Sequence, residues 1–176
     1  MSNSGEHALL NFEKLMERYG ESLMRLAFTY VKNHQVAEDI VQDVFIKAFE
    51  KKEEFRGDAS YQTYLYRMTV NRCHDYFRSW SFKNLFFTNK QQHLRLEKSA
   101  ESEVIEKTEQ YLLGEQILSL PLKYREVIVF YYYKEYRIEE IAKILEISPS
   151  TVKTRLKRAK ERLKIKISSK VGEEYG

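Results

Sequence analysis

The sequence predicts an all-α protein made of two small helical domains joined by a flexible linker. Apolar residues recur at steps of three and four along most of the chain, and no alternating strand pattern stands out. Only two prolines and six glycines occur in 176 residues, so few breakers interrupt the helices. After an apolar start, residues 81–110 are polar and weakly periodic, which is typical of a tether. We therefore expect domains at residues 8–80 and 111–171.

Three helices are expected in the N-terminal domain. Asn33 is a suitable N-cap for a second helix that runs to about Lys52. Residues 55–59 read as a loop, and a third helix follows from about Ser60 to Trp80. Gly20 is a mild weakness inside the first helix, whose apolar positions are Phe12, Leu15, Met16, Tyr19, Leu23, Leu26 and Tyr30.

The expected second helix has two distinct faces. Its buried face consists of Ala37, Ile40, Val41, Val44, Phe45 and Ala48. A second face gathers Asp39, Asp43, Ile46 and Glu50, with Gln42 near its edge. A solvated acidic stripe would account for this face. An aliphatic side chain among carboxylates also suits a basic protein partner, so both interpretations stay open.

The expected third helix carries a polar stripe between two apolar ones. The apolar stripes are Tyr66, Val70, Cys73 and Phe77, and Tyr61, Leu65, Met68 and Tyr76. Core packing explains most of these aromatic residues. The polar stripe, beside the loop at residues 55–60, also suits single-stranded DNA, because cations can hold phosphates while rings accept an unstacked base. It consists of Arg67, Asn71, His74 and Arg78.

The C-terminal domain is expected to contain a helix-turn-helix. Its first helix begins near Gln110 and ends near Pro121, and its second includes residues 127–132. A further helix then buries Ile138, Ile141, Ala142 and Leu145. Ile147 closes the turn, Ser148 is a good N-cap and Pro149 suits the first position of the last helix. That helix buries Val152, Leu156, Ala159 and Leu163.

The opposite side of the last helix is strongly basic. Residues 147–176 hold nine Lys or Arg against three Asp or Glu, while the whole chain carries a net charge of +4. Such a patch attracts phosphate, and a helix of this kind can offer donors to a DNA major groove. An ordinary helical hairpin with a solvated basic face is the alternative. The candidate base-reading residues are Ser150, Lys153, Thr154, Lys157 and Arg158, whereas Arg155, Lys160, Arg162 and Lys164 suit phosphates or solvent.

Composition argues against catalysis and against cofactors. Cys73 is the sole cysteine, which excludes an internal disulfide and fits a reducing compartment. Cys73 and His74 diverge by about 100° on a helix, so they form no nucleophile–base pair. Four scattered histidines provide no metal-ligand spacing, and no glycine-rich phosphate loop occurs. No signal pattern or membrane-length apolar run is seen, so a cytoplasmic protein is expected.

Three segments, in this order, resemble bacterial sigma factors of the extracytoplasmic-function (ECF) group of the sigma-70 family. AEDIVQDVFIKAFEK (residues 37–51) is similar to region 2.2, and FRGDASYQTYLYRMTVNRCHDYFR (residues 55–78) is similar to regions 2.3 and 2.4. Residues 120–164 resemble region 4. The resemblance covers nearly the whole chain. No counterpart of regions 1.1 or 3 of housekeeping sigma factors is seen, which favours the compact ECF group.

The resemblance implies partners and roles by position. Region 2.2 would dock on the clamp helices of the polymerase beta-prime subunit through Asp39, Gln42, Asp43 and Ile46. The −10 promoter element would be melted and read by the next segment, with Phe55 and Ser60 around a flipped base, Asn71 nearby, and Arg67, His74 and Arg78 along the helix. The −35 element would be bound by Lys153, Thr154, Lys157, Arg158 and Ser150 in the major groove, with Arg155 on the backbone.

The implied partners are therefore core RNA polymerase, through its beta-prime and beta subunits, promoter DNA, and an anti-sigma factor of the kind that usually controls this family. The linker would thread the polymerase near its RNA exit path. A two-domain helix-turn-helix repressor or activator, whose N-terminal half senses a ligand or dimerises, is the alternative. Such a repressor binds operator DNA without polymerase, usually as a symmetric dimer.

Overall fold

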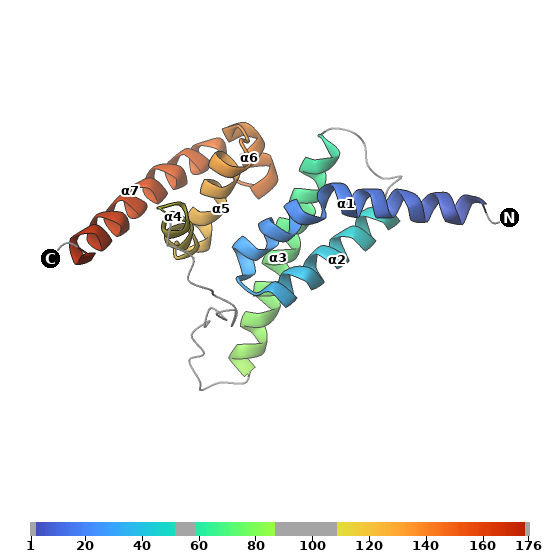
Figure 1. Cartoon of the computed structure of the whole chain (residues 1–176), viewed down its shortest axis with the longest axis horizontal. Coiled ribbons are helices and arrows are strands. Elements are labelled where there is room, and N and C mark those ends of the chain that lie inside the picture. Colours follow the sequence, from blue (N-terminus) through green and yellow to red (C-terminus); the bar gives the residue numbers. More distant parts are fainter. Residues whose placement is uncertain (1–2, 52–58, 87–108, 175–176) are drawn as a thin grey trace. The chain divides into compact units, whose positions relative to one another are not determined.

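The computed structural model describes the backbone of residues 3–51, 59–86 and 109–174, and the side-chain surroundings of residues 12–51, 59–79 and 113–168. Every regular element in these ranges is a helix. The chain divides into two compact units, Met1–Leu96 and Glu97–Gly176 (Figure 1). The expected all-α class with two helical domains is confirmed.

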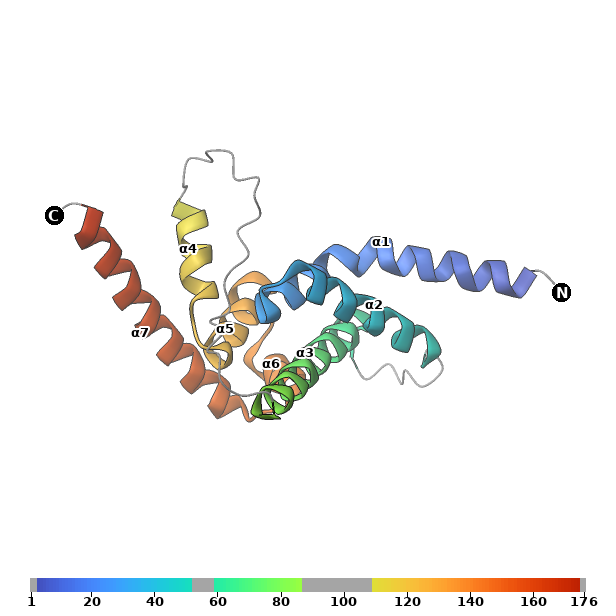
Figure 2. The same cartoon turned by 90° about the horizontal axis from the view of Figure 1, so that it is seen from below.

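The N-terminal unit is a three-helix bundle of α1 (Asn3–Val31), α2 (His34–Glu50) and α3 (Tyr61–Phe86), each in contact with the other two (Figures 1 and 2). The expected cap of the second helix is confirmed, because the Asn33 side chain accepts a hydrogen bond of 2.9 Å from the Val36 amide.

The core of this unit lies where the three helices meet. All six residues predicted for the buried face of α2, Ala37 to Ala48, are buried. Leu23 and Leu26 of α1 and Leu65 of α3 are fully buried as well, and burying each such side chain contributes about 1.5–3 kcal/mol. Buried Tyr66 places its hydroxyl 2.5 Å from the Ser22 hydroxyl. The apolar stripes therefore fix how α2 and α3 face solvent.

The third helix is longer than expected. It begins after Ser60, whose hydroxyl accepts a 3.1 Å hydrogen bond from the Thr63 amide. It then continues to Phe86, so the predicted end near Trp80 is wrong and residues 81–86, expected to begin the linker, are helical. No glycine or proline interrupts residues 61–86. The backbone can therefore continue its hydrogen-bonded ladder past Trp80.

The C-terminal unit packs α4 (Glu109–Leu118), α5 (Leu122–Ile128) and α6 (Ile138–Leu145) against α7 (Pro149–Glu174), the long red helix of Figures 1 and 2. The expected second helix of this domain is divided in two. After α5 the chain widens into a π-helical turn, η2 (Val129–Tyr133), closed by a 3.1 Å bond from the Lys134 amide to the Val129 carbonyl.

The turn between α6 and α7 has the predicted caps. The Ser148 hydroxyl accepts a 3.1 Å bond from the Thr151 amide, and α7 begins at Pro149. The backbone reverses at Glu146, whose φ of 55° is left-handed. Of the apolar residues predicted to be buried on the two helices, Ile138 is half-buried. The others are buried, namely Ile141, Ala142, Leu145, Val152, Leu156, Ala159 and Leu163.

Replacing Glu146 by glycine should stabilise the helix-turn-helix, because a side chain at positive φ costs energy that glycine does not incur. An increase of about 0.5–1 kcal/mol in the free energy of unfolding would slow amide exchange at Val152 and Ile141 about two- to fivefold in the full chain. Hydrogen exchange followed by NMR measures this. Glu146→Ala, which keeps the strain, is the control; equal exchange in both variants would contradict the prediction.

Candidate functional site

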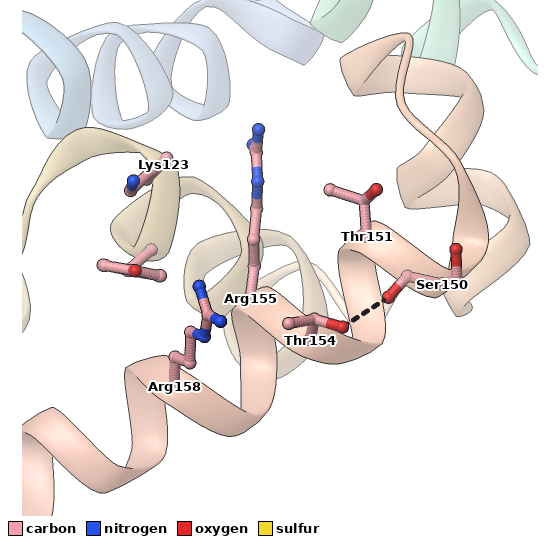
Figure 3. Close-up of a pocket in the computed structure, with 7 residues that line it drawn as sticks. Lys123, Ser150, Thr151, Thr154, Arg155 and Arg158 are labelled. Atoms are coloured by element: carbon pink, nitrogen blue, oxygen red, sulfur yellow. Dashed lines mark hydrogen bonds between the residues drawn. The ribbon is translucent and has the colours of Figure 1, made fainter.

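An open, cationic hollow lies between the start of α5 and the first turns of α7 (Figure 3). Its volume is about 280 Å³. Cationic and hydroxyl groups dominate its wall, and no carboxylate is among its lining residues, so it suits an anion such as a phosphate. The hollow is lined by Lys123 and Tyr124 of α5 and by Ser150, Thr151, Thr154, Arg155 and Arg158 of α7.

Arg155, expected on the DNA backbone, is engaged within the protein. Its Nη1 lies 2.8 Å from Oε1 of Glu126, a buried residue of α5 that is 4% exposed. The pair ties α7 to α5 and places the Arg155 guanidinium at the wall of the hollow. Arg155 therefore has a structural role that sequence reasoning did not include, beside the predicted contact to phosphate.

Arg158 is directed at Tyr124 of α5. Burial acts to raise the pKa of Tyr124, but a hydrogen bond with Arg158 and the nearby charges of Lys123 and Arg162 lower it below its ordinary value. The Lys123 Nζ and the Arg162 Cζ lie 5.2 Å and 5.1 Å from the Tyr124 ring centroid. Three cations therefore surround one phenol at the edge of the hollow. Lys123 and Tyr124 carried no signal in the sequence, because only tertiary packing places them beside α7.

The predicted base-reading residues of α7 form two rows on its exposed side. Ser150, Thr154 and Arg158 lie along the hollow, where the Thr154 hydroxyl donates a 3.0 Å bond to the Ser150 carbonyl (Figure 3). Lys153 and Lys157 are exposed but do not line the hollow. The second row is therefore open to a partner, while the first is partly engaged by α5.

On α2, the predicted docking residues are mostly open to solvent. Asp39 and Gln42 are exposed, and Ile46 is 52% exposed although it is aliphatic. Asp43 differs, because its Oδ2 lies 2.5 Å from Nε of Arg72 on α3 and 3.3 Å from Nζ of Lys47. The structure thus brings all four residues onto one face but engages Asp43 in ion pairs.

On α3, the predicted polar stripe is only partly exposed. Arg67, Asn71 and Arg78 are exposed, and Arg78 lies 2.7 Å from the Asp75 carboxylate. His74 is half-buried, with its ring centroid 5.7 Å from that of Tyr30 on α1. His74 therefore lies at the edge of the stripe, against the neighbouring helix, and its contact with the −10 element stays a prediction.

Aromatic rings gather at the start of α3, near the predicted flipped-base pocket. The Tyr61 ring centroid lies 6.2 Å from that of Tyr19 on α1 and 5.9 Å from that of Tyr64. Burial, then the neighbouring Tyr64 and Tyr19, raises the pKa of Tyr61. Ser60, which is predicted to lie beside the flipped −10 base, is exposed, and its hydroxyl caps α3. Phe55 lies outside the described residues.

The remaining chemistry of the described chain is sparse. Cys73 is a core thiol, as predicted, and burial raises its pKa to about 12. Across the described residues, no three His, Cys, Asp or Glu side chains come together as a metal site. Within the same residues no helix combines the length and apolar character that crossing a membrane requires.

Comparison with known proteins accounts for both units. Residues 15–81 match the family described as Sigma-70 region 2, and residues 111–163 match Sigma-70, region 4. The chain is 31% identical over 156 residues to the sigma factor SigV of Bacillus subtilis, covering 84% of this chain and 86% of the relative. It is 28% identical over 165 residues to the ECF sigma-E factor of Haemophilus influenzae, covering 89% of this chain and 87% of the relative.

Two solved structures share the fold. The sigma factor RpoE of Bartonella quintana, in complex with the anti-sigma factor NepR, is 20% identical with a TM-score of 0.69 and covers 90% of this chain and 97% of its own. CnrH, in complex with the cytosolic domain of CnrY, is 21% identical with a TM-score of 0.62, and the match covers 90% of this chain and 88% of CnrH.

Three findings point to the same family. The N-terminal unit has an exposed acidic and apolar helix face, the C-terminal unit has a cationic helix-turn-helix, and each unit matches a sigma-70 family model. The chain belongs to the sigma-70 family of RNA polymerase sigma factors, in its extracytoplasmic-function group, whose members are transcription initiation factors without catalytic activity of their own.

Proposed function

We propose that this chain binds core RNA polymerase, directs it to promoters through their −10 and −35 elements, and promotes melting of the DNA. The observation that carries this proposal is the presence, in one chain, of an open mixed face on α2 and a cationic hollow on a helix-turn-helix. Two tethered interfaces reinforce each other through effective concentration. A helix-turn-helix repressor or activator is not supported, since the N-terminal unit matches region 2.

Docking on polymerase is assigned to the exposed face of α2. Ile46 supplies apolar area that would be desolvated, and Asp39 and Gln42 beside it supply polar groups for a basic partner surface. The clamp helices of the beta-prime subunit, with contacts to the beta subunit, are the partner that the family resemblance implies.

The two proposed DNA interfaces bind different promoter elements, and their residues contact either bases or phosphates. Asn71 and Arg67 of α3, beside the Tyr19–Tyr61–Tyr64 cluster, suit the melted −10 strand, because amides and rings read and stack unpaired bases. Lys153 and Lys157 of the open row suit base edges of the −35 element, whereas the hollow suits a backbone phosphate. Arg158, held at Tyr124, is assigned to that phosphate.

Control by an anti-sigma factor is part of the proposal. The two solved relatives of similar fold were each determined with a bound partner, NepR for RpoE and the cytosolic domain of CnrY for CnrH. A partner of this kind would hold the chain inactive until a stress or envelope signal releases it. The site of action is the cytoplasm, where polymerase and promoter DNA are found.

Transcription in vitro tests the whole proposal. Purified chain and purified core polymerase, given a library of promoter fragments, should yield transcripts from a defined subset that core enzyme alone does not transcribe. Sequencing the transcript 5′ ends identifies the start sites and the shared upstream elements. A set of start sites unchanged by the chain would contradict the proposal.

Asp39→Lys should lower the affinity for core polymerase at least about tenfold, because a like charge is placed against a basic surface. Asp39 is a cleaner test than Asp43, whose reversal would also oppose Arg72 and Lys47. Fluorescence anisotropy of labelled chain titrated with core enzyme measures the affinity. Glu38→Lys, an exposed neighbour about 100° round the helix, is the matched control. Equal losses in both variants would indicate a net-charge effect and no docking face.

Asn71→Ala should reduce promoter opening about five- to tenfold while leaving duplex binding unchanged, since one hydrogen bond to an unpaired base is removed. Permanganate reactivity of −10 thymines reports opening, and a DNase footprint reports duplex binding. Ser79→Ala, exposed on α3, is the control. Normal thymine reactivity in the Asn71 variant would remove the melting assignment.

Arg158→Ala should weaken promoter binding equally for all −35 sequences and lower the slope of log affinity against log salt by about 0.9, as loss of one phosphate contact does. Lys157→Ala should instead alter the preferred −35 bases. Holoenzyme binding to a library of −35 variants at several salt concentrations separates the two. Sequence-selective loss in the Arg158 variant would place that side chain on a base edge.

A further inference from the structure

Tyr124 of α5 lies among cations that come from both helices of the hollow. Its side chain is buried, at 5% exposed, whereas Lys123, Arg158 and Arg162 are exposed. The Lys123 Nζ and the Arg162 Cζ lie 5.2 Å and 5.1 Å from the centroid of its ring. Arg158 forms a hydrogen bond with its hydroxyl. One buried phenol therefore contacts three exposed cations.

The partner of Arg158 is neutral, which distinguishes Arg158 from the other arginine of the hollow. The Arg155 Nη1 lies 2.8 Å from the Glu126 carboxylate, so much of the charge of Arg155 is compensated within the protein. A protonated phenol accepts a hydrogen bond from a guanidinium without cancelling its charge. Arg158 is therefore held in place and keeps its full attraction for an anion.

The Tyr124 ring also allows positive charge to gather at the hollow. The π-face of a phenol attracts cations, and the Lys123 ammonium and the Arg162 guanidinium both lie over it. Among the described residues that line the hollow, none is a carboxylate. The ring thus reduces the mutual repulsion of the cations without neutralising them, and an anion in the hollow would be attracted by their combined field.

Holding Arg158 before DNA arrives favours binding. An exposed arginine must give up rotamer freedom when it is fixed on a phosphate, and this loss of entropy weakens association. The hydrogen bond to Tyr124 already restricts the side chain in the unbound protein. Less freedom remains to be lost, so the same phosphate contact becomes tighter.

We propose that Tyr124 is a positioning residue for the −35 element: its hydroxyl holds the Arg158 guanidinium, still fully charged, where a phosphate of the DNA backbone enters the hollow. The proposal rests on the proposed sigma function and adds a residue to its −35 interface. It gives Tyr124 a role in affinity for all −35 sequences and none in the choice of bases.

Tyr124→Phe removes the hydroxyl and keeps the ring beneath its two cations. Holoenzyme containing this variant should bind −35 promoter fragments about three- to tenfold more weakly, because Arg158 must then be ordered on binding. The loss should be equal across −35 variants. The slope of log affinity against log salt should not change, since no cation is removed. Tyr133→Phe, at a 58% exposed tyrosine of η2, is the matched control and should bind as the unmodified chain does.

Adding Tyr124→Phe to Arg158→Ala tests whether the hydroxyl acts through Arg158. Without the guanidinium there is nothing to position, so the second substitution should cost less than about twofold. NMR relaxation of the Arg158 Nε–H group in the free chain is an independent measurement. Its order parameter should be lower in Tyr124→Phe than in the unmodified chain, and unchanged in Tyr133→Phe.

Fluorescence anisotropy of labelled promoter fragments measures these affinities, and far-UV circular dichroism checks that each variant is folded. A loss as large in the Arg158→Ala background as in the unmodified chain would show that the hydroxyl acts without Arg158, and would overturn the positioning role. So would full affinity of Tyr124→Phe, or an unchanged order parameter at Arg158. If the sigma function itself is wrong, holoenzyme made with the unmodified chain will not select these fragments, which is a separate result.

Discussion

The arrangement of the C-terminal unit depends on an ion pair between the buried Glu126 of α5 and the partly exposed Arg155 of α7. Glu126 is 4% exposed, and a carboxylate so enclosed needs a cation, since removing one partner of a buried pair costs about 3–5 kcal/mol. The contact joins α5 to α7 beside their shared apolar core. Lys123 and Tyr124 of α5 and Arg158 of α7 line the hollow next to it. Buried Arg125 adds to the same frame by donating two hydrogen bonds to the Leu120 carbonyl.

The two units place their interhelical ion pairs in different surroundings, with different consequences. In the Glu126–Arg155 pair, the Glu126 side chain is only 5% exposed, so solvent competes weakly for its carboxylate, whereas the Arg155 side chain is 24% exposed and also lines the hollow. In the pair between α2 and α3, the Asp43 side chain is 31% exposed and the Arg72 side chain 43%, although Oδ2 of Asp43 is itself buried. Ion pairs between partly exposed side chains contribute little to stability. Removing one partner is therefore expected to cost more in the C-terminal unit than in the N-terminal one.

Local features were predictable from the sequence, and contacts between distant segments were not. The caps at Asn33 and Ser148 depend on the next three residues, and the buried faces of α2 and α7 follow from helical spacing, so the sequence predicts both and the structure confirms them. The predicted end of α3 near Trp80 is wrong because the apolar patch that follows, interpreted as the start of the linker, continues the helical spacing. Arg155 pairs with a residue 29 positions away, and His74 packs on α1. No local pattern encodes such partners, which depend on how the helices pack.

Cys73 gives the N-terminal bundle a built-in chemical reporter. Its thiol is enclosed by packed side chains, and burial raises its pKa to about 12, so both access and thiolate formation are unfavourable while the bundle is folded. The C-terminal unit contains no cysteine at all. The rate at which an alkylating reagent consumes the thiol therefore counts openings of the bundle alone, in the intact chain and with any partner bound.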